Sequence, residues 1–399
     1  MDFQLSEDHL TLQKWVHEFA ENEIRPVAHE YDEREEFPWP VIKKAAEIGL
    51  YSIEFYMEQV SVDPTGLVLP ICLEETSWGC AGIGLGIWGT GLPLSTLAYT
   101  GTPEQLMQWA PLMFGTPDDP KVAALCVTEP GAGSDVSALR TTARRDGDEW
   151  VLSGQKIFAT NGGPASVRVV VATVDPELGH RGQAAFVIGP DTPGIKAGKK
   201  EKKLGIRASD TSEVILEDCR IPLENVLGGM DRLESKLERA RAKGTGVQPG
   251  SSAALKTFEV TRPSVAAQAV GIARAAFEFA TDYAKERRTF GRPLIEHQGV
   301  AFKLADMAME IDAARLLTHR AAWLGRNGQF EHAEGSMSKL KAGETAVWVT
   351  EQAIQILGGY GYIRDFPVEK WYRDAKIYTI FEGTSEIQRI VISRALARS

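Results

Sequence analysis

The segment Cys126–Asp135 has the composition of an anion-binding turn. It reads CVTEPGAGSD and follows an apolar run, so two glycines lie close to hydroxyl side chains at the end of an expected strand. Glycine allows backbone N–H groups to approach an anion closely, and the Thr128 and Ser134 hydroxyls add donors. An ordinary Pro-Gly hairpin turn is the alternative interpretation of these residues.

Glu382 is the candidate general base. It lies between Phe381 and Gly383, directly before a helical pattern over Ser385–Arg398. An apolar neighbour favours a raised carboxyl pKa, which suits proton abstraction, and the glycine allows a substrate to reach the backbone. The alternative is a plain acidic residue at the start of that helix.

The segment Gly84–Gly89 (GLGIWG) matches the G-x-G-x-x-G pattern of dinucleotide-binding folds. That pattern requires a preceding strand, a following helix and an acidic residue about twenty positions further on. Here residues 71–78 have a helical pattern, and Glu104 begins a helix instead of ending a strand. We therefore predict that these glycines allow close helix packing or open a cavity.

Length, charge and cysteine content exclude several classes of protein. The 399 residues suffice for two or three domains of about 150 residues each. A net charge of −10 argues against a nucleic-acid-binding surface, and four scattered cysteines give no metal-binding spacing. No apolar run of about 18 residues is available to span a membrane. The N-terminus lacks the early basic residues of a targeting peptide, so we expect a cytoplasmic protein.

The sequence pattern around the candidate residues changes twice along the chain. Residues 1–121 have mostly helical spacing, with Ser6 as a capping candidate. Residues 122–230 carry short β-branched runs between turn signals, which predicts an antiparallel β domain. The expected strands are Val122–Thr128, Trp150–Ser153, Lys156–Thr160, Val167–Val174, Ala184–Ile188 and Glu213–Leu216.

Residues 231–399 are helical again and predict a C-terminal four-helix bundle, because long helices with short breaks pack antiparallel. The expected helices are Ser264–Arg287, Gln298–Arg326, Ser336–Gly358 and Ser385–Arg398. An inserted loop at about 231–256 opens this domain. It comprises an exposed, densely charged helical turn over 231–243 and a Gly/Ser/Pro-containing loop over 244–254. The predicted fold class is therefore α+β.

The segment Cys126–Asp135 closely resembles the signature of the acyl-CoA dehydrogenases, FAD enzymes that oxidise acyl-CoA thioesters to 2-enoyl-CoA. Further matches follow in family order along the chain: Lys156–Gly163 (KIFATNGG), Lys203–Thr211 (KLGIRASDT), Glu286–Gly291 (ERRTFG), Gln355–Gly361 (QILGGYG) and Phe381–Ile387 (FEGTSEI). The helical–β–helical order is also that family's architecture. The sequence is most similar to the medium- and short-chain-like members, flavoproteins of fatty acid metabolism.

The resemblance implies a mechanism. Glu382 stands at the position of the family's catalytic base, which removes the α-proton of the thioester while the β-hydrogen leaves as hydride to N5 of FAD. In the family, the thioester carbonyl accepts hydrogen bonds from the backbone N–H of this residue and from a ribityl hydroxyl, an arrangement that stabilises a developing enolate. Some members carry the base elsewhere, at a position where this chain has Val260.

The resemblance also implies binding residues. The FAD positions are Leu125, Val127, Thr128, Gly133, Ser134, Phe158, Ala159, Thr160, Arg287, Thr289, Phe290, His297, Gln298, Gln355, Gly358, Gly359, Thr384 and Glu386. Phe158 replaces the tryptophan that the family usually has beside the flavin ring. The substrate positions are Ser134, Gly84, Trp88, Glu259, Arg262, Phe381 and Gly383.

The glycine-rich segment lies where the family has the floor of its acyl cavity. On one continuous helix, Gly84, Trp88 and Leu92 share a face. Trp88 would limit depth and Gly84 would add width, so we expect a short-to-medium, branched or cyclic acyl group.

The resemblance also implies partners. They are an electron-transfer flavoprotein as the electron acceptor and a homotetramer in which a neighbouring subunit supplies some FAD contacts. Two alternatives stay open: an oxygen-using oxidase or monooxygenase on the same fold, and a catalytically silent subunit of a mixed assembly.

Overall fold

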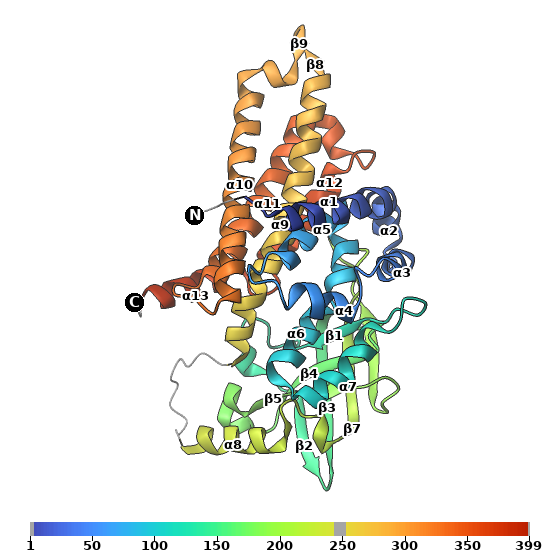
Figure 1. The fold of residues 1–399 in the computed structure, drawn as a ribbon, viewed down its shortest axis with the longest axis vertical. Coiled ribbons are helices and arrows are strands. Elements are labelled where there is room, and N and C mark those ends of the chain that lie inside the picture. Colours follow the sequence, from blue (N-terminus) through green and yellow to red (C-terminus); the bar gives the residue numbers. More distant parts are fainter. Residues whose placement is uncertain (1–3, 243–252, 398–399) are drawn as a thin grey trace.

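The computed structural model describes residues 4–242 and 253–397, and its three parts follow one another along the chain (Figure 1). The first part is helical, as predicted. Ser6 caps its first helix, because the side chain accepts a hydrogen bond from the His9 N–H. Its helices are α1 Glu7–Phe19, α2 Ala28–Arg34, α3 Trp39–Glu47, α4 Ile53–Phe55, α5 Val68–Trp88, α6 Gly91–Thr100 and α7 Pro103–Phe114.

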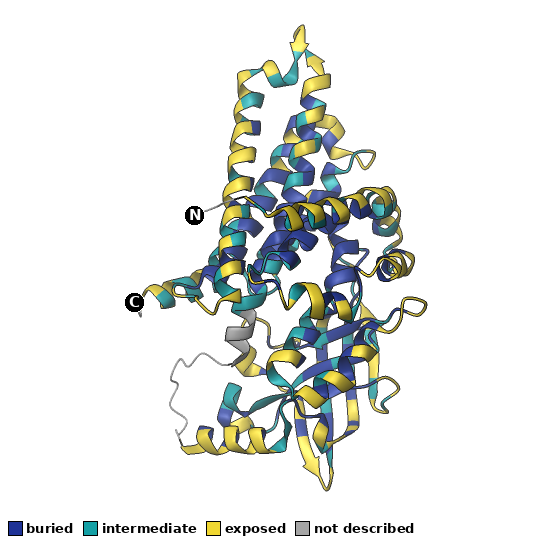
Figure 2. Ribbon diagram, viewed as in Figure 1, coloured by how far each residue is buried: buried dark blue, intermediate teal, exposed yellow. Residues whose placement is uncertain are grey.

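Helix α5 runs through the centre of the molecule, and almost all of its residues are buried (Figure 2). Its backbone leaves helical geometry at Cys80, so the helix is broken there. A Cβ at Gly271 on α9 (Ala253–Glu286) would collide with the Glu74 carbonyl, so a glycine permits this close crossing. In the described part of the chain no single helix is long and apolar enough to cross a membrane, although α5 and α6 together pass that test as a bent pair.

The middle part is a seven-stranded sheet in the order β1-β4-β2-β3-β7-β6, with β5 paired to β4. The strands are β1 Ala123–Cys126, β2 Thr142–Asp146, β3 Glu149–Thr160, β4 Val167–Thr173, β5 Gln183–Ile188, β6 Ile195–Lys200 and β7 Thr211–Pro222. The sheet is mainly antiparallel, as predicted, except that β4 pairs in parallel with β1 and, at one position, with β2. Strands β2 and β6 were not predicted, and the two runs expected at 150–153 and 156–160 form one strand, β3.

The charged segment after the sheet is more than the exposed turn that we expected. Residues Gly229–Ala242 form helix α8, whose apolar face packs Leu233 and Leu237 into the core of the middle sheet. Charged side chains cover its outer face. Most of the loop expected over 244–254 lies outside the described residues.

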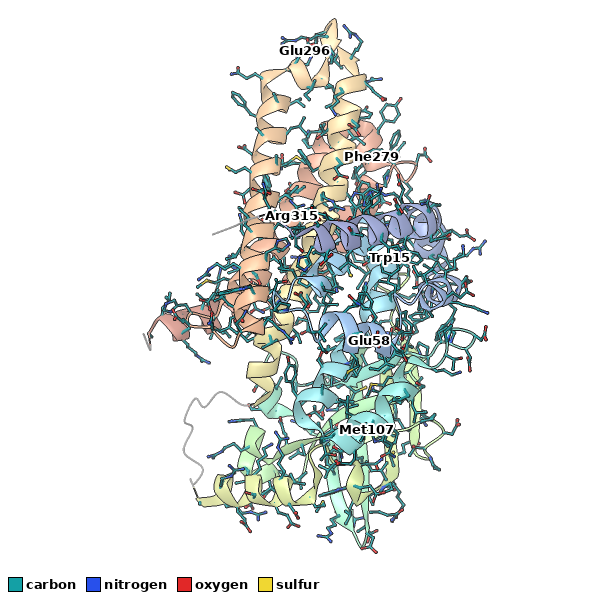
Figure 3. The ribbon with its side chains drawn as sticks, viewed as in Figure 1. Trp15, Glu58, Met107, Phe279, Glu296 and Arg315 are labelled. Atoms are coloured by element: carbon teal, nitrogen blue, oxygen red, sulfur yellow. The ribbon has the colours of Figure 1, made fainter. Side chains whose placement is uncertain are left out.

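The C-terminal part contains the four predicted helices, three of them with nearly the expected bounds and the first beginning eleven residues before the expected start at Ser264. They are α9, α10 Gln298–Arg326, α11 Glu334–Leu357 and α13 Ser385–Leu396, with the short α12 Val368–Ala375 between the last two. A two-stranded hairpin, β8 Arg288–Thr289 with β9 Arg292–Pro293, joins α9 to α10 at the far end of the molecule (Figure 1). Figure 3 labels Glu296 beside this hairpin and Arg315 near the middle of α10.

Candidate active site

Glu382 and Gly383 form a strained turn between the 3₁₀ turn at Lys376–Thr379 and α13. The φ angles are +53° at Glu382 and +88° at Gly383, both in the left-handed region. A Cβ at position 383 would lie 2.6 Å from Nε2 of Gln388, so only glycine fits there. A non-glycine residue in this region costs of order 1–3 kcal/mol and persists only where its surroundings fix it.

Glu382 is half-buried, and one of its carboxylate oxygens is buried without a partner. Its Oε2 atom has no hydrogen-bond partner among the described residues. Burial raises the pKa of this carboxyl above its ordinary value, and the nearby charges of Arg262 and Lys339 oppose that rise. A carboxylate with an unsatisfied buried oxygen and a raised pKa is a suitable proton acceptor for a group that docks beside it.

Arg262 and Glu259 lie beside Glu382 in a buried polar cluster. The guanidinium of Arg262 is ion-paired with Glu259 through Nη1, which also donates to Ser336 Oγ at 2.5 Å. Glu259 in turn accepts hydrogen bonds from the Ser336 N–H and hydroxyl, both at 2.8 Å. Nε of Arg262 has no partner among the described residues. Arg262 on α9 thus places a positive charge near the Glu382 carboxylate.

The segment after β1 forms an open, rigid cradle. A buried ion pair between Lys156 and Glu129, with an Nζ–Oε1 distance of 2.7 Å, fixes its base, and the Ile157 N–H donates to the Thr128 carbonyl at 2.8 Å. A Cβ added at Gly131 or Gly133 would meet no atom within 4 Å. The cradle therefore has room for a ligand at its backbone.

The predicted flavin-binding side chains around this cradle are available. No hydrogen bond in the described residues engages the hydroxyls of Thr128, Ser134 or Thr160. Phe158 has φ +56° and its ring is 59% exposed, an unusual position for an aromatic residue. Leu125 and Val127 are half-buried, and Ala159 is buried in β3.

The other predicted FAD residues occupy a different region. Arg287, Phe290, Gln298, Gln355, Gly358 and Gly359 are exposed at the β8–β9 end of the molecule. His297 contacts Thr289 there, with 3.1 Å between its Nε2 and the Thr289 carbonyl. Position 287 follows position 262 by 25 residues on α9, about 38 Å at 1.5 Å per residue. One chain therefore does not bring these residues to Glu382.

Thr384 and Glu386 lie between these two regions. Thr384 caps α13 by accepting a hydrogen bond from the Ile387 N–H at 3.3 Å. Both residues line an open cavity of about 390 Å³ between α11 and α13, together with Glu344 and Trp348. Phe381 packs edge-on against Tyr378 with 5.0 Å between ring centroids, which holds it beside the base.

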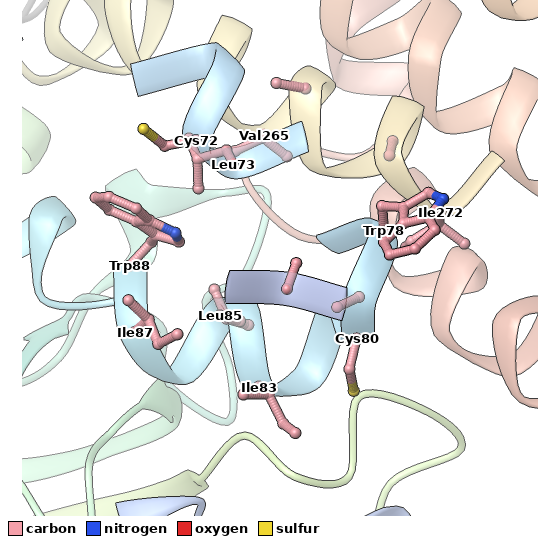
Figure 4. Close-up of a cluster of buried hydrophobic side chains, with 14 of the residues drawn as sticks. Cys72, Leu73, Trp78, Cys80, Ile83, Leu85, Ile87, Trp88, Val265 and Ile272 are labelled. Atoms are coloured by element: carbon pink, nitrogen blue, oxygen red, sulfur yellow. The ribbon is translucent and has the colours of Figure 1, made fainter. Parts of the chain in front are cut away.

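The glycine-rich segment is folded differently from the continuous helix that we expected. Helix α5 ends at Trp88 and α6 begins at Gly91, so Leu92 does not share a face with Gly84 and Trp88. Gly84 and Trp88 both face Thr76: the Trp88 indole donates to its hydroxyl at 3.0 Å, and a Cβ at Gly84 would lie 3.3 Å from it. The Trp88 ring lies in a buried cluster with Cys72 and Val265 (Figure 4).

The comparisons with known proteins agree along the whole chain. Three family models match in order: the N-terminal domain of acyl-CoA dehydrogenase at residues 6–115, its middle domain at 124–219 and its C-terminal domain at 248–397. The chain belongs to the acyl-CoA dehydrogenase family. Members of this family are FAD-dependent oxidoreductases.

Individual relatives of this acyl-CoA dehydrogenase cover almost its full length. A mitochondrial short-chain specific acyl-CoA dehydrogenase of Rattus norvegicus is 42% identical over 400 residues, covering 99% of this chain and 92% of the relative. Butyryl-CoA dehydrogenase from Megasphaera elsdenii has a TM-score of 0.87 at 34% identity, with both chains fully covered. A structure described as the electron transferring flavoprotein of Acidaminococcus fermentans matches with a TM-score of 0.89 at 39% identity, again over both full chains.

Two side chains that contact the Glu382–Gly383 turn of this acyl-CoA dehydrogenase were not predicted. Lys339 on α11 donates from Nζ to the Gly383 carbonyl at 2.6 Å. Gln388 on α13 donates from Nε2 to the carbonyls of Glu382 at 3.0 Å and Gly383 at 2.8 Å. Both are buried, and no local sequence signal distinguishes them from ordinary helix residues.

Proposed function

We propose that this chain catalyses α,β-dehydrogenation of an acyl-CoA thioester to the trans-2-enoyl-CoA, with Glu382 as the general base. The observation that carries the proposal is the buried, unpartnered Oε2 of Glu382. A buried polar atom left without a partner is rare and costly, and a substrate that delivers a proton to it explains why it is retained.

The residues around Glu382 then have defined tasks. The carboxylate accepts the α-proton, and burial raises its pKa above the ordinary value, which makes it a stronger base. In the described residues the Glu382 N–H also lacks an acceptor, so it is available to donate to the thioester carbonyl as negative charge develops there. Phe381 and the buried Tyr378 keep water from the base. When bound, FAD supplies the oxidation by accepting the β-hydrogen as hydride.

The residues of the open cradle fit FAD. Unfilled space over Gly131 and Gly133 allows a ligand to reach the backbone, and the hydroxyls of Thr128, Ser134 and Thr160 are free to donate or accept. Phe158 offers an exposed aromatic face beside them. We assign the flavin half of FAD to this cradle, with Leu125, Val127 and Ala159 as its backbone neighbours.

The second group of FAD residues requires a second copy of the chain. Arg287, Phe290 and Gln355 lie at the far ends of α9 and α11, and Arg287 is about 38 Å along α9 from Arg262. Their side chains are exposed there, with Phe290 96% exposed. We propose that this end holds the ADP half of FAD bound to a neighbouring subunit in a homotetramer. Sedimentation of the FAD-loaded protein tests the assembly, and a monomer that retains FAD would contradict it.

The acyl group is proposed to be short to medium in length, or branched or cyclic. Trp88 is buried and fixed by its hydrogen bond to Thr76, and Phe55 and Tyr56 pack against its ring. A rigid tryptophan limits cavity depth more firmly than a flexible side chain would. Initial rates with C4, C8 and C16 acyl-CoAs test this, and the fastest turnover on C16 would contradict it.

The decisive experiment combines Glu382→Gln with anaerobic reduction of bound flavin by acyl-CoA. The variant is expected to remain yellow, because FAD is held elsewhere, and to lose at least about 10²-fold in the rate of flavin bleaching, as general-base catalysis contributes at least that much. Glu238→Gln, which removes an exposed carboxylate on α8, is the matched control and should bleach normally. Bleaching of Glu382→Gln at the wild-type rate would place the base elsewhere.

The same preparation separates the alternatives. An electron-transfer flavoprotein is the proposed acceptor, so turnover should need an added acceptor. Oxygen consumption without one would favour the oxidase or monooxygenase, and colourless protein that takes up no FAD would favour the silent subunit. The Rattus norvegicus relative above carries a mitochondrial name, so the cytoplasmic location stays a prediction.

A further inference from the structure

The peptide groups of Glu382 and Gly383 are bound from two helices at once. Lys339 approaches from α11 and binds the Gly383 carbonyl, and Gln388 approaches from α13 and binds both carbonyls. The two side chains are 1% and 0% exposed. Among the described residues, no other side chain donates a hydrogen bond to these two carbonyl groups.

These hydrogen bonds hold the Glu382–Gly383 backbone in a conformation that it would otherwise leave. Two consecutive residues have positive φ, and one of them is not glycine. Such a pair persists only if the surroundings determine it, because the left-handed region is sterically unfavourable for a residue with a side chain. The three hydrogen bonds from Lys339 and Gln388 fix this pair of residues, because a peptide group that rotates out of place loses them.

We propose that Lys339 and Gln388 are positioning residues that fix the Glu382–Gly383 turn for proton abstraction, and that Lys339 alone also supplies positive charge that favours the ionised base. The inference rests on the proposed role of Glu382. The two residues share the geometric task, but only Lys339 carries a charge, so the two contributions can be separated.

The charge of Lys339 acts among few other ionisable groups. Arg262 and Glu259 face the site from α9, Glu344 lies on the same helix as Lys339, and Glu386 lies on α13. Burial lowers the pKa of Lys339 to about 8, against the opposing effect of the nearby Glu382 charge. Below that pH the ammonium favours the carboxylate form of Glu382, and above it this support is lost.

The experiment compares Lys339→Met and Gln388→Met in the FAD-loaded enzyme. Both are expected to lower kcat by roughly 10²-fold with little change in KM, because a displacement of about 1 Å at the reacting group costs that much. Only Lys339→Met should move the acidic limb of the kcat–pH profile to higher pH and abolish the fall in kcat near pH 8. Gln388→Met should keep both limbs in place.

Lys341→Met is the matched control. It removes a lysine and its ion pair with Glu310 from the same helix, without a contact to the turn, and should leave kcat and both limbs unchanged. If Lys339→Met does not fold, Lys339→Arg keeps the charge and does not titrate near pH 8, so it should lower kcat, retain the acidic limb and lose the fall near pH 8. Flavin absorbance and melting temperature establish folding in every case.

Two results would overturn the inference. One is a wild-type kcat in folded Lys339→Met, and the other is an equal displacement of the acidic limb by both methionine variants, which would remove the special role of the charge. The Glu382→Gln measurement tells these apart from a failure of the proposed function. If Glu382→Gln loses activity while both methionine variants turn over normally, only the positioning role is wrong.

Discussion

Replacing Arg274 by methionine tests what holds the first and third parts of the molecule together. Arg274 on α9 donates from Nη1 to Glu74 at 2.8 Å and to Glu75 at 2.7 Å, and it is also ion-paired with Glu75 through Nη2. The side chains of the two acidic residues on α5 are 5% and 1% exposed, so they depend on their partners. Arg274→Met leaves them buried beside each other without that cation.

The loss in the free energy of unfolding depends on the partners that Glu74 and Glu75 keep. Removing one member of a buried ion pair costs about 3–5 kcal/mol. Glu74 keeps Arg315, with an Nη2–Oε1 distance of 2.9 Å, and Glu75 keeps hydrogen bonds from Gln13 and His17, both at 2.8 Å. We therefore expect the lower end of that range, about 3 kcal/mol. Figure 3 labels Arg315 on α10, near the crossing of α1.

Urea unfolding at fixed protein concentration and saturating FAD measures the loss, because bound cofactor and subunit assembly shift apparent stability. A second substitution, Glu75→Gln, should restore much of the stability to Arg274→Met, because a neutral amide needs no cation and can still bond to Gln13 and His17. A change below about 1 kcal/mol in Arg274→Met, typical of an exposed pair, would refute the reasoning. The reasoning would also be refuted if the effects of Arg274→Met and Glu75→Gln on the free energy of unfolding were strictly additive.

Three other outcomes are expected. Alanine at Gly131 or Gly133 should leave the melting temperature nearly unchanged yet weaken FAD binding in a fluorescence titration, because the added methyl group meets solvent space and not protein. Burial tends to raise the pKa of Glu74, but the charges of Arg315 and Arg274 outweigh that effect and hold this pKa below 4.5. The ionised Glu74 therefore stabilises the fold above that pH, and this contribution is lost on acidification below it. Urea midpoints measured as a function of pH will show the loss. Trp88→Ala should raise the rates on C8 and C16 relative to the rate on C4 in an acyl-CoA panel, at a stability cost of about 3–5 kcal/mol.

The sequence predicted most helices well and the sheet less well. The expected bounds of α10 are those observed, because glycine and proline precede it and Asn327 and Gly328 follow it. Strands β2 (TARRD) and β6 (IKAGKK) were missed, since their mostly exposed, charged side chains hide the alternation of a half-buried strand. Strand β3 was divided in two because Gly154, with a bulge beside it, interrupts its apolar pattern.

The sequence alone allows Glu382 to be proposed as the base, but it does not reveal the side chains that bind the Glu382–Gly383 turn. Glu382 lies directly between Phe381 and Gly383, so the residues that suggest its role are its neighbours in sequence. Lys339 is 44 residues away in sequence from the carbonyl that it binds, and it reaches that carbonyl only because α11 packs beside the turn. A lysine inside a helix usually predicts a solvent-exposed side chain, and only the folded arrangement buries this one.

Several of the buried side-chain atoms that lack a hydrogen-bond partner lie around the Glu382–Gly383 turn. Of the ten side-chain atoms that lack a hydrogen-bond partner among the described residues, three belong to Glu382, Arg262 and Gln388, which surround one turn. Stability alone does not account for this concentration, because each such group costs about 1–3 kcal/mol. Satisfying the turn internally would also consume the atoms that a substrate must meet. The fold therefore leaves polar groups unsatisfied where a thioester is proposed to dock, while Lys339 and the Nε2 of Gln388 hold the backbone that carries them.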